Sequence, residues 1–485
     1  MGKTATRVAF AGLALLLAFT TFVLAERGNV QRQSFKAFYC AGVAVRERQD
    51  PYRVEPLRSC ERALEPVQMP SGYVEPAPLP GYVLVPFAGL SALPAKRAAE
   101  LFAVLLALAS ILSAICLAEV IPASAPAILL ALAPLTLLNV AYGEIPPFAM
   151  LAICASAYFL AKQRWGAAGV AVALALIQPN VGLPAALAVF IFAPRSRAAI
   201  AISALSLAAI SVAGLGITRN LEYFTHVLPL LANAELVASD QYSLSRLLYV
   251  IGAGPNLALL IGKIWFVGIA AFGILLAGKL AAGGRNREIL PLLPPAAVLL
   301  LGIYLHDIQM LIALPVALLI AARARGSALM VLAGVSLALL ITVWTQPARP
   351  VVVLINAAGV MGGLFAVTQG RMNRRMALAA GGALAAIVVF VSMQHAGPPA
   401  AAALVTHNFG ALPDEFSPAA WGRYLRATPA LTRTVFAPQL ATWLGLLGLL
   451  VSAAWSVSAA TPAQSESRVP RPASEPYSGF SQKYD

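Results

Sequence analysis

Side chains that can move protons or bind charged groups occur in short motifs between long apolar runs. They are Glu144 in YGEIPP, Gln178 in ALIQPN, Asp240 in ASDQYSLSRLL, and His306 with Asp307 in IYLHDIQM. Carboxylates can act as general bases, and imidazole holds or releases a proton near neutral pH. Ionisable groups are costly at membrane depth, so their grouping at the ends of apolar runs predicts a functional site. For each residue taken alone, an ordinary polar helix end is the alternative explanation.

Four basic side chains could neutralise an anionic ligand such as a lipid phosphate. Lys96 and Arg97 follow a short apolar segment, Lys263 lies within an apolar run, and Arg246 follows Asp240 by six positions. A cation in lipid is costly unless an anion meets it, and a phosphate would serve. The alternative is that these long side chains extend to the headgroup layer.

The composition sets the class of protein. Of the 485 residues, 60% are hydrophobic and only 11% are charged, whereas a soluble domain carries roughly 25% charged residues. The apolar runs recur along the whole chain and reach membrane-spanning length. The excess of Lys and Arg, 34 against 20 Asp and Glu, is explained by basic loops that fix topology rather than by nucleic-acid binding.

We therefore expect an all-α, polytopic bundle of about 14 membrane spans. The expected spans are 8–25, 98–118, 126–141, 147–161, 166–178, 181–194, 198–215, 257–280, 288–304, 308–322, 326–345, 350–369, 375–393 and 437–457. Residues 1–460 form the membrane domain, and the Ser/Pro/Glu-rich tail 461–485 is expected to be disordered and cytoplasmic. The segment 81–93 is too short to span and is expected to be re-entrant or interfacial.

Basic residues favour one orientation of these spans. They gather in alternate short loops, namely Lys162 and Arg164, Arg195 and Arg197, Arg285 and Arg287, Arg323 and Arg325, and Arg371 to Arg375. The positive-inside rule assigns these loops to the cytoplasm. The segments 26–80, 217–255 and 394–435 are then extracytoplasmic, and Cys40 and Cys60 of the first one are expected to pair there.

The ordered motifs resemble glycosyltransferase family 87. SFKAFYCAGVAVRERQDPY, PAPLPGYVLVPFAGL, YGEIPP, ALIQPN, DQYSLSRLL and GIYLHDIQML follow one another as in that family, over roughly residues 1–345. The resemblance implies the C-type glycosyltransferase fold. It also implies a polyprenyl-phosphate-linked sugar donor, typically mannose, and a glycan or glycolipid acceptor, with no cofactor and no metal.

The chain departs from the family pattern at the residue that such enzymes would use as base. The family has an Asp where this chain has Ser34, and it has Gln and Lys where this chain has Glu144 and Gln178. A Ser hydroxyl cannot accept a proton near neutral pH, so a replacement carboxylate must approach the same cavity. Glu144 is the first candidate for the catalytic base because it lies on irregular backbone before two prolines. Asp50 is the second, with a turn-forming role beside Pro51 as the alternative.

The predicted function is transfer of a sugar on the outer face of the plasma membrane, and the resemblance implies that this sugar is mannose. The expected substrate-binding residues are Tyr39, Tyr52, Lys96, Arg97, Gln178, Asp240, Gln241, Ser243, Arg246, Lys263, His306 and Asp307. An inactive relative that binds lipid or organises envelope assembly is an alternative, supported by the Ser at position 34. A transporter or flippase is a second alternative, although it should carry charges at mid-membrane rather than at one edge.

Overall fold

A computed structural model describes residues 8–17, 20, 33–64, 74–121, 123–284, 286–345, 350–368, 411–427 and 437–458. The regular elements in these ranges are all helices, and the single β-type contact there is a bridge between Arg53 and Phe416. The predicted all-α class is therefore confirmed. The predicted span 375–393, the tail 461–485 and residues 394–410 and 428–435 of the last outer segment lie outside the described residues.

The elements follow the apolar runs of the sequence. In chain order they are α2 (Gln33–Arg46), α3 (Val54–Leu64), α4 (Gly81–Leu90), α5 (Ala95–Ala118), α6 (Ala125–Tyr142), α7 (Pro146–Ala161), α8 (Trp165–Leu174), η1 (Ala175–Ile177), α9 (Pro179–Phe192), η2 (Pro194–Ser196), α10 (Arg197–Glu222), η3 (Tyr223–Val227), α11 (Leu228–Glu235), α12 (Leu244–Val250), α13 (Pro255–Leu280), η4 (Ala282–Gly284), α14 (Ile289–Val298), η5 (Asp307–Ala313), α15 (Leu314–Arg323), α16 (Ser327–Ile341), α17 (Pro350–Thr368), α19 (Ser417–Ala427) and α21 (Ala437–Ser458). Proline begins α7, α9 and α13, where its fixed φ and missing N–H suit the first turn.

Six helical stretches among the described residues are long and apolar enough to cross a membrane. They are Ala95–Ala118, Ala125–Tyr142, Pro194–Glu235, Pro255–Leu280, Pro350–Thr368 and Gln439–Val457. Shorter apolar helices occupy the positions of the other expected spans, for example α7, α9 and α14. The chain therefore has the character of a membrane protein, whereas the count of about 14 spans stays a prediction.

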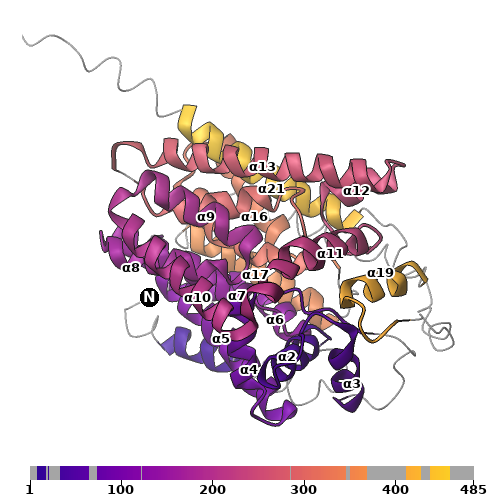
Figure 1. The fold of residues 1–485 in the computed structure, drawn as a ribbon. Coiled ribbons are helices and arrows are strands. Elements are labelled where there is room, and N and C mark those ends of the chain that lie inside the picture. Colours follow the sequence, from indigo (N-terminus) through magenta and orange to yellow (C-terminus); the bar gives the residue numbers. More distant parts are fainter. Residues whose placement is uncertain are drawn as a thin grey trace, which may run out of the picture.

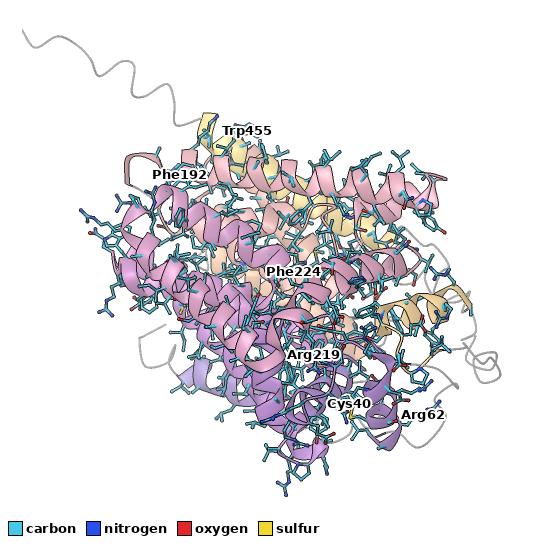
Figure 2. All side chains as sticks on the ribbon, viewed as in Figure 1. Cys40, Arg62, Phe192, Arg219, Phe224 and Trp455 are labelled. Carbon is cyan, nitrogen blue, oxygen red and sulfur yellow. A yellow bond between two sulfur atoms is a disulfide. The ribbon has the colours of Figure 1, made fainter. Side chains whose placement is uncertain are left out.

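The core lies around the hairpin formed by α14, η5 and α15. Every residue of α14 and most residues of α15 are buried. By contrast, only 17% of the most apolar window of Pro194–Glu235 and 28% of that of α13 are buried inside the protein. These helices run along the outside of the bundle (Figure 1), and exposed apolar side chains such as Phe192, Phe224 and Trp455 project from its surface (Figure 2). A surface of this kind suits lipid rather than water.

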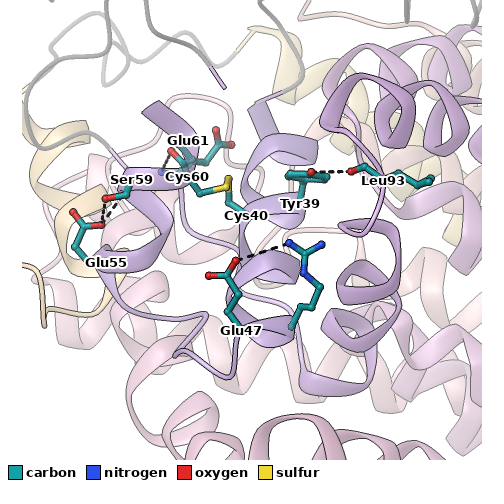
Figure 3. Close-up of a disulfide and its surroundings, with 10 residues drawn as sticks. Tyr39, Cys40, Glu47, Glu55, Ser59, Cys60, Glu61 and Leu93 are labelled. Carbon is teal, nitrogen blue, oxygen red and sulfur yellow. Dashed lines mark hydrogen bonds and ion pairs between the residues drawn. A yellow bond between two sulfur atoms is a disulfide. The ribbon is translucent and has the colours of Figure 1, made fainter. Parts of the chain in front are cut away.

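The first polar segment folds into two helices that a disulfide joins. Cys40 of α2 is bonded to Cys60 of α3, with their Cα atoms 5.6 Å apart (Figure 3), so the predicted pairing is present. On its other side α2 crosses α4 closely, because a Cβ at Gly42 would lie 2.4 Å from the carbonyl oxygen of Phe87. Only glycine permits this approach.

Residues 411–427, which come late in the chain, pack on the first polar segment. The amide of Val54 donates to the carbonyl of Glu415 at 2.8 Å, and the amide of Ser417 donates to the carbonyl of Tyr52 at 2.8 Å. The guanidinium carbon of Arg53 lies 3.7 Å from the centroid of the Phe416 ring. Residues 411–427, which we name the cap, are thus held on residues 52–58.

Basic loops gather at one end of the bundle. The guanidinium carbons of Arg195 and Arg287 lie 5.9 and 4.8 Å from the centroid of the Trp165 ring. Arg323 donates to the amide oxygen of Asn286 at 3.0 Å, which brings a third loop to the same end. The charge pattern predicted such a common end, and the motifs described next lie at the opposite ends of the same helices.

Candidate functional site

A cavity of about 500 Å³ lies where several helices end. Its walls come from the start of α2, the turn between α6 and α7, the break between η1 and α9, and the loop that precedes η5. The outer segment after α11 and the cap complete it. The residues with polar side-chain groups that line it are Ser34, Glu75, Tyr142, Glu144, Gln178, Asn180, Tyr223, Glu235, Asp240, Tyr304, His306, Asp307, Gln309, Thr345 and Trp421.

Five of the predicted site residues therefore meet in one cavity. They are Glu144, Gln178, Asp240, His306 and Asp307, which are separated by up to 163 positions (307 minus 144) in the sequence. Glu144, Gln178, His306 and Asp307 lie at or next to helix ends, and Asp240 lies in the connection between α11 and α12. This placement agrees with the expectation drawn from the motifs, while the role of each residue stays a prediction.

Glu144 and Ser34 contact each other in the cavity. The carboxylate of Glu144 accepts a hydrogen bond from the hydroxyl of Ser34. The contact is possible because Gly143 ends α6 with a φ of 73° and leaves no Cβ, which would lie 2.5 Å from the Cβ of Phe35. Burial raises the pKa of Glu144, and this effect outweighs the opposing influence of the Ser34 hydrogen bond and the His306 charge. A carboxylate with a raised pKa is suited to take up a proton.

Asp307 is a second half-buried acid of the cavity. Its Oδ1 accepts from the backbone amide of Ile308 at 2.8 Å, and its Oδ2 accepts from the hydroxyl of Thr345. Burial raises the pKa of Asp307, and the nearby charge of Asp240 acts in the same direction. These two hydrogen bonds fix the position of the carboxylate, so Asp307 is suited to orient a ligand.

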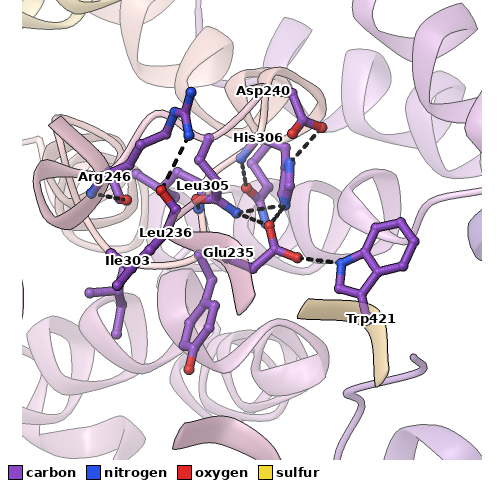
Figure 4. Close-up of polar contacts among 12 residues, drawn as sticks. Glu235, Leu236, Asp240, Arg246, Ile303, Leu305, His306 and Trp421 are labelled. Atoms are coloured by element: carbon purple, nitrogen blue, oxygen red, sulfur yellow. Dashed lines mark hydrogen bonds and ion pairs between the residues drawn. The ribbon is translucent and has the colours of Figure 1, made fainter. Parts of the chain in front are cut away.

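His306 lies at the centre of a polar network (Figure 4). Its Nδ1 is 3.1 Å from Oδ2 of Asp240, and its Nε2 is 3.7 Å from Oε2 of Glu235. Burial alone would lower the pKa of His306, but Asp240, Glu235 and Glu144 together raise it to about 10. The same attraction lowers the pKa of Asp240 against the opposing effect of desolvation. These carboxylates therefore favour the protonated form of His306.

Gln241 and Trp421 hold the Glu235 carboxylate from two sides. Nε2 of Gln241 donates to Oε2 of Glu235 at 2.9 Å, and Nε1 of Trp421 donates to Oε1 at 3.1 Å. The amide oxygen of Gln241 accepts from the backbone of Leu305 at 3.2 Å, which fixes the orientation of the amide. Gln241 is thus a buried positioning residue behind the cavity, although the sequence suggested a contact with substrate.

Gln178 presents an unused hydrogen-bond acceptor. The residue lines the cavity and is only 6% exposed, and its Oε1 has no hydrogen-bond partner among the described residues. The next polar residue, Asn180, is 3.4 Å from the carbonyl of Tyr304. An unsatisfied buried acceptor is costly, so a ligand that donates to Gln178 would remove that cost.

Three candidates from the first polar segment lie outside the cavity. Asp50 pairs with Nε of Arg53 at 3.1 Å and accepts from the amide of Tyr52 at 3.0 Å. The hydroxyls of Tyr52 and Tyr39 donate to the carbonyls of Leu79 at 2.8 Å and Leu93 at 2.9 Å. In this structure these residues stabilise the segment and do not face the cavity, because their polar groups are engaged locally.

The four predicted cations also lie outside the cavity lining. Lys96, Arg97 and Lys263 are exposed on the surfaces of α5 and α13. Arg246 is 1% exposed, and its Nη1 donates to the carbonyl of Leu236 at 3.2 Å, whereas its Nε and Nη2 have no partner among the described residues. His306 is accordingly the one basic side chain among the described residues that line the cavity. Ser243 caps α12 by accepting from the amide of Arg246 at 3.3 Å, and it lies behind the cavity as well.

The sequence interpretation missed Glu75, Glu235, Thr345 and Trp421. Glu235 ends a long apolar stretch, which is the same signal that identified Glu144, so it could have been found. Trp421 lies in the cap, and nothing near it in the sequence indicates a cavity. A scan against protein-family models and a search of curated proteins found no match to this chain.

Proposed function

We propose that the protein is a membrane glycosyltransferase that moves a sugar, with mannose the first expectation, from a polyprenyl phosphate to a glycan or glycolipid acceptor. The observation that carries the proposal is the hydrogen bond between Ser34 and Glu144. The resembled family has a carboxylate at position 34. This chain has Ser34 there, and Glu144, which contacts Ser34, supplies the carboxylate instead. A relocated base supports an active enzyme over an inactive relative.

The proposed reaction gives one role to Glu144 and another to His306. Glu144 takes the proton of the acceptor hydroxyl as its oxygen attacks the anomeric carbon of the donor sugar. The bond between that carbon and the phosphate oxygen breaks, and the polyprenyl phosphate leaves with the bonding electron pair. The His306 cation, the one positive side chain among the described lining residues, stabilises the charge of the leaving phosphate.

An apolar side of the cavity would accommodate the isoprenoid chain. Leu183 of α9, Leu231 of α11 and Phe266 of α13 line it, and Leu183 is also 47% exposed on the apolar surface of the bundle. A residue that both lines the cavity and faces outward indicates an opening toward lipid. The proposal includes the C-type fold, about 14 spans and an outward-facing site in the plasma membrane, as the motif order and the loop charges suggest.

The decisive experiment measures transfer from polyprenyl-phosphate mannose by the Glu144→Gln variant. Loss of a general base should lower the rate by about 10²–10⁴-fold. The double variant Ser34→Asp/Glu144→Gln returns a carboxylate to the neighbouring position and should recover part of the rate. Glu119→Gln is the matched control, because Glu119 pairs with Lys162 at 2.9 Å, remote from the cavity lining. Unchanged transfer by Glu144→Gln would remove Glu144 from the mechanism.

One observation favours an inactive, lipid-binding relative as the second candidate. No Lys or Arg is among the described residues that line the cavity, and a donor phosphate is usually met by such cations. Wild-type protein that binds polyprenyl-phosphate mannose, and transfers nothing to any acceptor, would establish this alternative. Activity that appears only in Ser34→Asp would show that the base was lost from an intact scaffold.

A further inference from the structure

The outer end of the cavity combines one indole ring with acids. Trp421 comes from α19 in the cap, Glu235 ends α11, and Asp240 follows in the next loop, and all three line the cavity. Figure 4 shows Trp421 beside Glu235, with His306 and Asp240 beyond it. Leu228 of α11 also lines the cavity.

The indole ring is fixed in direction. Its Nε1 donates to Oε1 of Glu235 at 3.1 Å, and its ring stacks on Tyr424 with centroids 5.3 Å apart. Glu235 is itself held by Gln241 at 2.9 Å, and Asp240 is held by His306 at 3.1 Å. A ligand at this end would therefore meet a preorganised wall, which lowers the entropic cost of binding.

The chemistry of this wall selects its ligand. Carboxylate oxygens accept hydrogen bonds, so a ligand that meets these oxygens must bring donors. A flat indole offers an apolar face on which the C–H groups of a sugar ring can rest. Several hydroxyl donors on a ring with an apolar face describe an uncharged pyranose.

We propose that Trp421, Glu235 and Asp240 form a subsite for the uncharged glycosyl ring of the acceptor. The assignment of that ring to the acceptor rests on the proposed function, whereas the sugar-binding chemistry rests on the cavity. Figure 1 supports the assignment, because α19 and α9 lie on opposite sides of α11. The lipid opening at Leu183 of α9 is thus separated from Trp421, so a lipid-linked donor and an acceptor can enter from different sides.

A binding experiment tests the subsite without requiring turnover. Methyl α-D-mannopyranoside is titrated against protein in phospholipid nanodiscs, free of glycoside detergents, and binding is followed by saturation-transfer NMR. Trp421→Ala should weaken binding by about tenfold, equivalent to about 1.4 kcal/mol. Trp421→Phe keeps a ring and should weaken it less, and Glu235→Gln should weaken it by removing the charged acceptor. Trp455→Phe is the control, since Trp455 is 48% exposed and does not line the cavity.

The outcomes separate this inference from the proposed function. Each variant is first compared with wild type in thermal unfolding, and Trp421→Phe carries the test if Trp421→Ala does not fold. No saturable binding by wild type, or wild-type binding by Trp421→Phe and Glu235→Gln, overturns the subsite. If the wild type binds the mannoside but transfers no sugar, the subsite stands and the proposed function fails.

Discussion

His306 is the residue on which most charges of the cavity act. Its ring lies between Asp240 and Glu235, and these acids together with Glu144 raise its pKa from 6.5 to about 10 against the effect of burial. A raised pKa means that the folded protein binds this proton more tightly than the unfolded chain does. The stability that His306 contributes is thus complete below pH 6.5 and is lost as the pH rises through about 10.

The pH dependence of unfolding should reveal this contribution. Between pH 6.5 and pH 10, the melting temperature of the wild type should fall more steeply than that of His306→Gln. Asp240→Asn removes the carboxylate nearest to the His306 ring and should lower the pKa of His306. The pH range over which the melting temperature falls should then end below pH 10. Thermal unfolding in nanodiscs at several pH values measures both effects. Equal slopes for wild type and His306→Gln would show that the ring is not protonated in the folded state.

The sequence identified the residues that lie at helix ends and missed those held by distant contacts. Glu144, Gln178, Asp240, His306 and Asp307 could be predicted because each one interrupts an apolar run. Asp50 could not be judged in the same way, because its role depends on Arg53, which also contacts Glu222 at 3.3 Å and the carbonyl of Asp414 at 2.9 Å. Nothing local in the sequence reports contacts of that kind.

At the scale of elements, Gly42 of α2 and Gly89 of α4 differ in whether a larger side chain would fit. Gly42 of α2 faces the Phe87 carbonyl at the crossing, whereas a Cβ at Gly89 of α4 would meet nothing within 4 Å. Gly42→Ala forces the helices apart and should cost about 1–3 kcal/mol of stability. Gly89→Ala restricts only the unfolded chain and should stabilise by about 0.4–1 kcal/mol.

This pair of alanine variants is a matched test measured by thermal unfolding. Because α2 also carries Ser34, Gly42→Ala should reduce sugar transfer as well, whereas Gly89→Ala should leave transfer unchanged. A neutral Gly42→Ala would mean that α2 and α4 do not cross as closely as described. The apolar runs predicted the helix bounds well, but they could not reveal this crossing or the complete burial of α14, since both depend on neighbours far away in the chain.

At the scale of the whole molecule, the candidate site and the basic loops lie at opposite ends of the same helices. The helix α7 has 16 residues and is therefore about 24 Å long, with Pro146 at the cavity and Ala161 next to the basic loop at Lys162. The helix α9 repeats the arrangement, from Pro179 at the cavity to Arg195 and Arg197 beyond its far end. This separation is what the positive-inside rule requires of a site that faces outward.

Labelling of single cysteines in intact cells tests that orientation. Glu47→Cys lies beside the disulfide-bonded segment, and Gln163→Cys lies in a basic loop, and both positions are exposed. A membrane-impermeant maleimide should label position 47 in intact cells and should label position 163 only after permeabilisation. The reverse pattern would place the cavity on the cytoplasmic side and would contradict an extracytoplasmic transferase.

The contact between Arg53 and the cap has a consequence for biosynthesis. Arg53 and its partner Asp414 are 361 residues apart, and a ribosome adds roughly 5–20 residues each second. The first polar segment therefore waits about 20 to 70 s for its partner to be made. Trp421 arrives at the same late moment, so one wall of the cavity is absent until the chain is nearly complete. A nascent chain shorter than about 420 residues lacks the Trp421 wall of the cavity, so the cavity stays incomplete while the bundle is still being made.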